Sequence, residues 1–307
     1  MKMNVELPVW RSLLYVPVNV DRFVDKAHTR GADCIQLDLE DSVPAAEKER
    51  ARALVRQAAA KVRRGGADVI VRINRPLSLA VRDIEASVCP DVIGLAISKV
   101  DGPSHVRLLD ELAGELEQRA GLAVGHTKFV VMIETPQAFF DMRAIAQASP
   151  RVVGMNIGGE DLALECGMHA DGEALMPAKQ QMIIAARAAG VMPLGFIDSV
   201  ADFSDSERFR AMARRSRRLG FDGASCIHPG QVKIVNEEYR PGEEEVAYAR
   251  RVIDADREAR KAGRGAFQLD GMMIDIPVVA RAQRLLARNE AIQAREAKTQ
   301  AVMAAGG

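Results

Sequence analysis

The chain has 307 residues, of which 48% are hydrophobic, so it is long and apolar enough to bury a full core. Its 42 lysines and arginines balance 42 aspartates and glutamates, which argues against nucleic acid or an anionic membrane as the main partner. The four cysteines form no metal-binding or disulfide pattern, and no apolar run approaches the roughly 18 residues of a membrane span. We therefore expect a soluble, cytoplasmic protein.

Short runs rich in valine, isoleucine and leucine recur between longer segments whose apolar residues have helical spacing. Eight runs have this character, at residues 12–16, 34–39, 69–73, 92–97, 129–133, 152–157, 192–197 and 223–227. Helical spacing occurs between them at residues 45–64, 104–119, 136–147, 173–189 and 204–219. This alternation predicts a parallel sheet that is buried on both faces.

Eight such units predict an α/β fold of the (β/α)8 type, the TIM barrel, whose usual size is about 250 residues. A doubly wound open sheet is the alternative, because periodicity does not show whether a sheet closes. The first strand is not followed by a Gly-x-Gly-x-x-Gly turn, and the chain has no Walker loop. The chain therefore lacks the nucleotide-binding motifs that would favour an open sheet.

The pattern changes after residue 227. A polar segment containing Pro241 and Gly242 precedes two more predicted helices, at residues 244–262 and 276–298, with a break at residues 263–268. We predict a barrel domain over residues 1–235 and a C-terminal helical extension over residues 236–307.

Two carboxylates follow neighbouring strands at the end of the barrel where catalytic groups gather. Glu134 directly follows the run 129–133, and Thr135 and Pro136 predict a helix start that would fix its position. Asp161 follows the glycine pair 158–159 after the run 152–157. Such oxygen ligands, with no histidine or cysteine beside them, suit Mg²⁺. The alternative is that each acid only stabilises a helix N-terminus.

Three basic residues lie within or just after predicted strands. Arg72 lies in a buried run, so it either pairs with Asp38 or Glu40 or clamps a substrate carboxylate. Lys99 either reaches an anion or pairs with Glu40 or Asp41, and we favour the structural pairing. His228 stands alone before a proline and a glycine, which favours a hydrogen-bonding role in a loop over that of a base.

Eight short motifs follow one another along most of the chain. They are RSLLYVP at 11–17, GADCIQLDLED at 31–41, VRIN at 71–74, SKV at 98–100, IET at 133–135, GGEDL at 158–162, CIHP at 226–229 and MIDIP at 273–277. In this combination and order the sequence resembles the citrate lyase β-subunit-like acyl-CoA lyases. These are the citryl, malyl and citramalyl thioester lyases within the HpcH/HpaI aldolase/citrate lyase family.

The resemblance implies a Mg²⁺-dependent barrel enzyme, with Mn²⁺ as an alternative metal. Such an enzyme cleaves or forms the bond between an acetyl-type CoA thioester and a 2-oxo acid such as pyruvate, glyoxylate or oxaloacetate. It also implies a role for each matching position: Glu134 and Asp161 as metal ligands, Arg72, Glu134 and Gly159 as substrate-binding residues, and Asp275 with Arg72 as catalytic residues. Arg22 and Lys26 are candidates for the CoA phosphates, although a solvated helix face is the preferred interpretation of these two residues.

Family members carry the residue matching Asp275 on a C-terminal lid that often reaches a neighbouring subunit. The resemblance therefore implies a homo-oligomer, a trimer or hexamer, in which the extension is both lid and oligomerisation segment. The same site is also compatible with three alternative functions. These are a malyl-CoA or citramalyl-CoA thioesterase, a citryl-carrier-protein lyase subunit of a citrate lyase complex, and an aldolase that needs no CoA.

Overall fold

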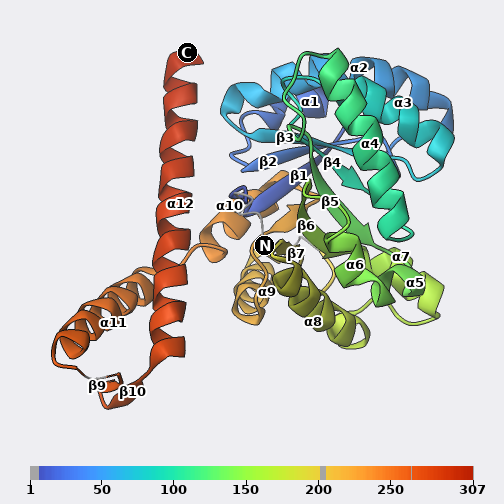
Figure 1. Cartoon of the computed structure of the whole chain (residues 1–307). Coiled ribbons are helices and arrows are strands. Elements are labelled where there is room, and N and C mark those ends of the chain that lie inside the picture. The colour runs from blue at the N-terminus through green and yellow to red at the C-terminus, as the bar shows by residue number, and fades with distance from the viewer. Residues whose placement is uncertain (1–6, 201–204, 264, 307) are drawn as a thin grey trace. The chain divides into compact units, whose positions relative to one another are not determined.

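The computed structural model describes residues 7–200, 205–263 and 265–306. The chain divides into two compact units, of which the first runs to Tyr239 and the second spans Arg240–Ala304, and Figure 1 labels most of their helices and strands. None of the helices in these described ranges is long and apolar enough to cross a membrane.

The first unit is built on an eight-stranded parallel sheet in the order β7-β6-β5-β4-β3-β2-β1-β8. One parallel bridge, between Leu194 and Gly223, joins the two outer strands and brings the sheet round into a barrel. The predicted barrel is thus confirmed. The strands are β1 (Ser12–Pro17), β2 (Cys34–Asp38), β3 (Asp68–Ile73), β4 (Gly94–Ile97), β5 (Lys128–Ile133), β6 (Val152–Ile157), β7 (Met192–Leu194) and β8 (Ala224–Cys226).

The strand β7 ends at Leu194, three residues before the predicted end, because the chain turns at Gly195 (φ +142°) and bonds there to Gly223. The predicted helix 136–147 is also shorter, since Asp141 (φ −96°, ψ 5°) leaves the helical conformation and divides it in two. The predicted helix at 204–219 begins at Ser206, and its first residue lies outside the described residues.

Helices surround the sheet in Figure 1, as a barrel requires. The helices of this unit are α1 (Asp21–Ala27), η1 (Ala45–Glu47), α2 (Lys48–Val62), η2 (Arg63–Gly65), α3 (Leu77–Ser87), α4 (Pro103–Arg119), α5 (Pro136–Phe140), α6 (Met142–Ala146), α7 (Gly159–Cys166), α8 (Gly172–Ala189), α9 (Ser206–Leu219) and α10 (Pro229–Glu238).

The barrel has one core between strands and helices and a second core inside the strands. Alternation along each strand separates them, so that Leu13 belongs to the inner cluster and Leu14 to the outer one. Trp10, fully buried, joins the inner cluster just before β1 and donates a hydrogen bond of 2.8 Å to Asp68 at the start of β3. The amino ends of the strands are thereby filled, which leaves the carboxyl ends for a site.

The second unit contains α11 (Glu243–Lys261), a hairpin of β9 (Phe267–Leu269) and β10 (Met272–Ile274), and α12 (Ile276–Gly306). The hairpin was not expected from the periodicity. Its turn, Asp270–Gly271, has positive φ at both residues (52° and 78°), and Asp-Gly is a strong local signal for such a turn. Ile274 packs with Val252 of α11 and with α12 in a small core of this unit.

Candidate active site

Arg72 is held by carboxylates from the turn that follows β2. It donates from Nε and Nη2 to the two oxygens of Asp38 at 2.7 and 2.8 Å, and its Nη1 lies 2.8 Å from Glu40. The Tyr15 ring centroid is 4.8 Å from the guanidinium carbon. Burial raises the pKa of Asp38, but the hydrogen bonds from Arg72 outweigh burial and hold that pKa below its ordinary value. The sequence left two roles for Arg72 open; the structure shows the ion pair, and substrate binding stays a prediction.

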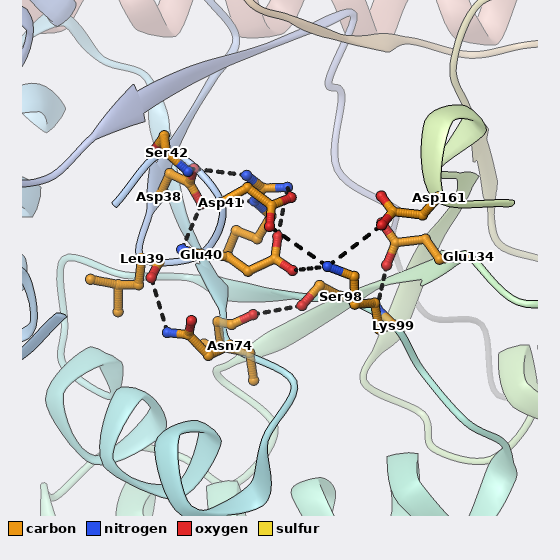
Figure 2. Close-up of polar contacts among 12 residues, drawn as sticks. Asp38, Leu39, Glu40, Asp41, Ser42, Asn74, Ser98, Lys99, Glu134 and Asp161 are labelled. Carbon is orange, nitrogen blue, oxygen red and sulfur yellow. Dashed lines mark hydrogen bonds and ion pairs between the residues drawn. The ribbon is translucent and has the colours of Figure 1, made fainter. Parts of the chain in front are cut away.

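Lys99 follows β4 and stands between the acidic side chains of the barrel mouth (Figure 2). Its Nζ lies 2.9 Å from Glu40 and 3.6 Å from both Asp41 and Asp161. Its backbone N–H donates to the Glu134 carboxylate. The expected pairing of Lys99 with the acids after β2 is confirmed, and the ammonium group is the positive charge around which these carboxylates gather.

Glu134 stands at the end of β5 with only 2% of its surface exposed. The Oγ of Thr135 accepts a hydrogen bond from the backbone N–H three residues on, so the predicted helix cap is confirmed. Burial, together with the negative charges of Glu40 and Asp161, raises the pKa of Glu134 to about 7. A buried carboxyl poised near neutral pH is typical of a functional site.

Asp161 lies in the first turn of α7, and Figure 2 shows its carboxylate beside that of Glu134. The backbone of Gly158 passes so close to Glu134 that a Cβ at this position would overlap the carboxylate. The absence of a side chain at Gly158 is therefore what allows the turn before α7 to close against β5. The two predicted metal ligands are neighbours because of this turn.

The donor set fits a hard divalent cation. Among the described residues, no group of three or more histidine, cysteine, aspartate or glutamate side chains could hold a metal, so Glu134 and Asp161 would act as a pair. Mg²⁺ commonly uses one or two carboxylates and fills its other positions with water or substrate oxygens. A cation beside Glu134 would also favour the ionised carboxylate that burial disfavours.

A cavity of about 570 Å³ opens between α1 and the carboxyl ends of β1 to β3. Arg22 and Lys26, the two predicted CoA-binding residues, line it together with Arg30 of the following loop. Arg72 and Asp41 line the same cavity, so the structure brings the basic residues of α1 and the Arg72 cluster to one space. Sequence reasoning missed Arg30, since its only signal is a third positive charge at near-helical spacing from Arg22 and Lys26.

A second cavity, of about 220 Å³, is lined by residues of β6, β7 and α8. Gly159, predicted to bind substrate, lines it. So does Lys179, which sequence reasoning missed, although a lysine four residues after Leu175 and three before Met182 stands on the apolar face of α8.

Two other predicted residues have clear positions. His228 caps α10, and its ring Nδ1 accepts a hydrogen bond of 3.1 Å from the N–H of Gly230, which confirms the predicted loop role. Asp275 belongs to the second unit, where it is exposed between β10 and α12 and accepts a hydrogen bond from the N–H of Val278 at 3.3 Å. Its proposed catalytic role stays a prediction.

Known proteins are similar to this chain in sequence and in fold. The chain is 36% identical over 279 residues to the citrate lyase subunit beta of Leuconostoc mesenteroides subsp. cremoris, covering 90% of this chain and 92% of that protein. It is 35% identical over 289 residues to the (3S)-malyl-CoA thioesterase of Cereibacter sphaeroides, covering 93% and 96%. A crystal structure of the protein CitE from Mycobacterium tuberculosis, in complex with magnesium, acetoacetate and coenzyme A, superposes with a TM-score of 0.71 at 29% identity and covers 92% of this chain and 98% of its own. The family model of the HpcH/HpaI aldolases and citrate lyases matches residues 11–229. The chain therefore belongs to the HpcH/HpaI aldolase/citrate lyase family.

Proposed function

We propose that this chain is a Mg²⁺-dependent carbon–carbon lyase for a 3-hydroxyacyl-CoA thioester such as citramalyl-CoA or malyl-CoA. The products are acetyl-CoA and a 2-oxo acid, which is pyruvate, glyoxylate or oxaloacetate, and the same enzyme forms the bond in the reverse direction. The observation that carries the proposal is the neighbouring pair of carboxylates, Glu134 and Asp161, at a barrel mouth that also holds Arg72. Relatives named as a citrate lyase subunit and as a malyl-CoA thioesterase support this substrate class.

Glu134 and Asp161 would hold Mg²⁺, which supplies Lewis-acid polarisation of the substrate hydroxyl and carboxylate when bound. Arg72 stabilises negative charge at the oxo-acid end. The Asp38 carboxylate occupies Nε and Nη2 and so fixes the plane of the guanidinium. A guanidinium carries five N–H donors, and Nη1 already faces Glu40 and Asp41, so Arg72 retains the second hydrogen of Nη2 for a substrate carboxylate.

Asp275 is the proposed acid/base group that returns a proton to the thioester enolate after the carbon–carbon bond breaks. It lies beside Met273 and Ile276, which are 73% and 72% exposed. Apolar side chains this exposed around an acidic group suit a lid that covers a substrate and excludes water. We further propose that the second unit is this lid, that it is shared between subunits of a trimer or hexamer, and that Arg22 and Lys26 contact CoA phosphates.

The test is cleavage of citramalyl-CoA and malyl-CoA with and without a chelator. We expect cleavage that stops with EDTA and returns with Mg²⁺. Asp275→Ala should abolish turnover and keep Mg²⁺ affinity, whereas Glu134→Ala should lose both. A chain that gives no lyase product with any 3-hydroxyacyl thioester, or two variants that lose Mg²⁺ binding equally, would contradict the proposal.

A thioesterase is the second candidate, favoured by the 35% identity to a protein of that name. It needs the same metal-bound thioester with water as the acceptor. Release of free CoA together with intact malate or citramalate would identify it.

The third candidate is a citryl-carrier-protein lyase subunit, favoured by the citrate lyase relative. Activity with a carrier-protein thioester, and none with the CoA thioester, would identify this function.

A further inference from the structure

Lys179 is a buried cation that has no hydrogen-bond or ion-pair partner among the described residues. Its side chain projects from α8 with 7% of the residue exposed, and it lines the 220 Å³ cavity. Among the residues that the structure describes, none forms a hydrogen bond or ion pair with it; Asp198 and Glu160 act on it only from a distance. Burial lowers its pKa, because water is removed without a compensating contact. Such a group is costly to bury unless something else supplies an acceptor.

The nearby acids Asp198 and Glu160 do not supply this acceptor. Glu160 is exposed, so water screens its charge. Asp198 accepts a hydrogen bond of 2.8 Å from the N–H of Ser199, and although both acids line the cavity, neither lies within hydrogen-bond distance of Lys179. The three donors of the Lys179 ammonium group therefore remain available to a ligand in the cavity.

Asn156 of β6 adds a second unpartnered polar atom to the same cavity. Its Oδ1 is buried without a hydrogen bond to any described residue. A half-turn of the amide would present the NH₂ group at this point, so Asn156 also offers a donor to an anion.

The cavity adjoins the proposed reaction centre. Gly158 and Gly159, from the turn that brings Asp161 to Glu134, form part of its wall. Tyr15 and Ile227 line both this cavity and the larger one that contains Arg22 and Lys26. A substrate whose thioester arm occupies the larger cavity could thus place another substituent of its reacting carbon in the smaller one.

We propose that the 220 Å³ cavity is a specificity pocket in which Lys179, assisted by Asn156, binds a second carboxylate on the oxo-acid part of the substrate. The inference rests on the proposed lyase function and specifies its substrate: a 3-hydroxyacyl thioester that yields a dicarboxylic 2-oxo acid. Lys179 is a specificity-determining residue here and takes no part in bond cleavage.

Citryl-CoA and citramalyl-CoA test this directly, because they differ by a carboxymethyl or a methyl group on the same carbon. The wild-type protein should prefer citryl-CoA. Lys179→Met should lower kcat/KM for citryl-CoA about tenfold or more, mainly through KM, since a hydrogen-bonded charge is lost. The same variant should change kcat/KM for citramalyl-CoA less than about threefold, and Lys179→Arg should recover part of the preference.

Gln180→Met is the matched control, because it makes the same change one residue along α8 at an exposed position. An equal loss with both substrates would show that Lys179 is merely structural, and no loss with either would show that the pocket is not used; both outcomes overturn the inference. If the wild-type protein cleaves neither of these substrates nor malyl-CoA, the lyase proposal fails. Calorimetric binding of oxaloacetate and of pyruvate, each with Mg²⁺, then decides the inference separately: it survives only if oxaloacetate binds more tightly and Lys179→Met removes the difference.

Discussion

Replacing Glu134 by glutamine should make the stability of the metal-free protein less dependent on pH. The pKa of Glu134 is raised from 4.5 to about 7, because its carboxyl is buried beside Glu40 and Asp161. The folded protein therefore holds this proton more tightly than the unfolded chain does. The contribution of Glu134 to the free energy of unfolding is greatest below pH 4.5, falls as the pH rises, and is lost once the pH passes about 7.

The size of the effect follows from the pKa difference. At about 1.4 kcal/mol for each pH unit, the whole change amounts to about 3 kcal/mol, of which about 2.5 kcal/mol falls between pH 5 and pH 8. Because the residue is 2% exposed, solvent screening reduces this little. Glu134→Gln removes the titrating group. As the pH rises from 5 to 8, the free energy of unfolding of the variant should therefore increase by about 2.5 kcal/mol relative to that of wild type.

The assay is urea unfolding at several pH values with a chelator present, for wild type, Glu134→Gln and a control. Glu115→Gln serves as the control, because it removes an exposed glutamate on α4. Unfolding free energies of wild type and Glu134→Gln that stay parallel from pH 5 to pH 8 would refute the reasoning. The affinity of wild type for Mg²⁺ should increase with pH, up to tenfold for each pH unit, until the pH reaches about 7. The reason is that metal binding displaces the proton from Glu134.

Three further changes test the surroundings of this carboxyl. Gly158→Ala should weaken Mg²⁺ binding at least tenfold in calorimetry, because its Cβ would overlap the Glu134 carboxylate; unchanged affinity would contradict that packing. Asp38→Asn should lower the free energy of unfolding in urea by about 3 kcal/mol, since it removes the two-bond partner of buried Arg72 but leaves a second carboxylate; a loss below about 1 kcal/mol would show that the pair is not needed. Lys99→Met should strengthen Mg²⁺ binding about fivefold, or about 1 kcal/mol, because it removes a competing cation; weaker binding would show that Lys99 supports the metal.

Much of the fold is a local property of the chain. Apolar runs alternate with helical segments, and each of the eight predicted runs overlaps one of the barrel strands. Adjacent residues likewise determine the helix start at Thr135 and Pro136. They thereby also determine the position of Glu134 at the end of β5. The β9–β10 hairpin could have been found from Asp270 and Gly271, because a turn of this kind depends on two neighbouring residues.

The sequence by itself determined which strands form and which polar residues stand at their ends, because those properties depend on neighbours within a few positions. Only the tertiary structure decided what these residues do to one another. Arg72 bonds to Asp38 from 34 positions away, and Lys99 reaches Glu40 from 59. The pKa of Glu134 near 7 likewise arises from burial among side chains of other elements, as does the position of the Lys179 ammonium group, which has no partner in the described part of the chain. Charge interactions and desolvation depend on distance in space, and the closure of the barrel is what sets those distances.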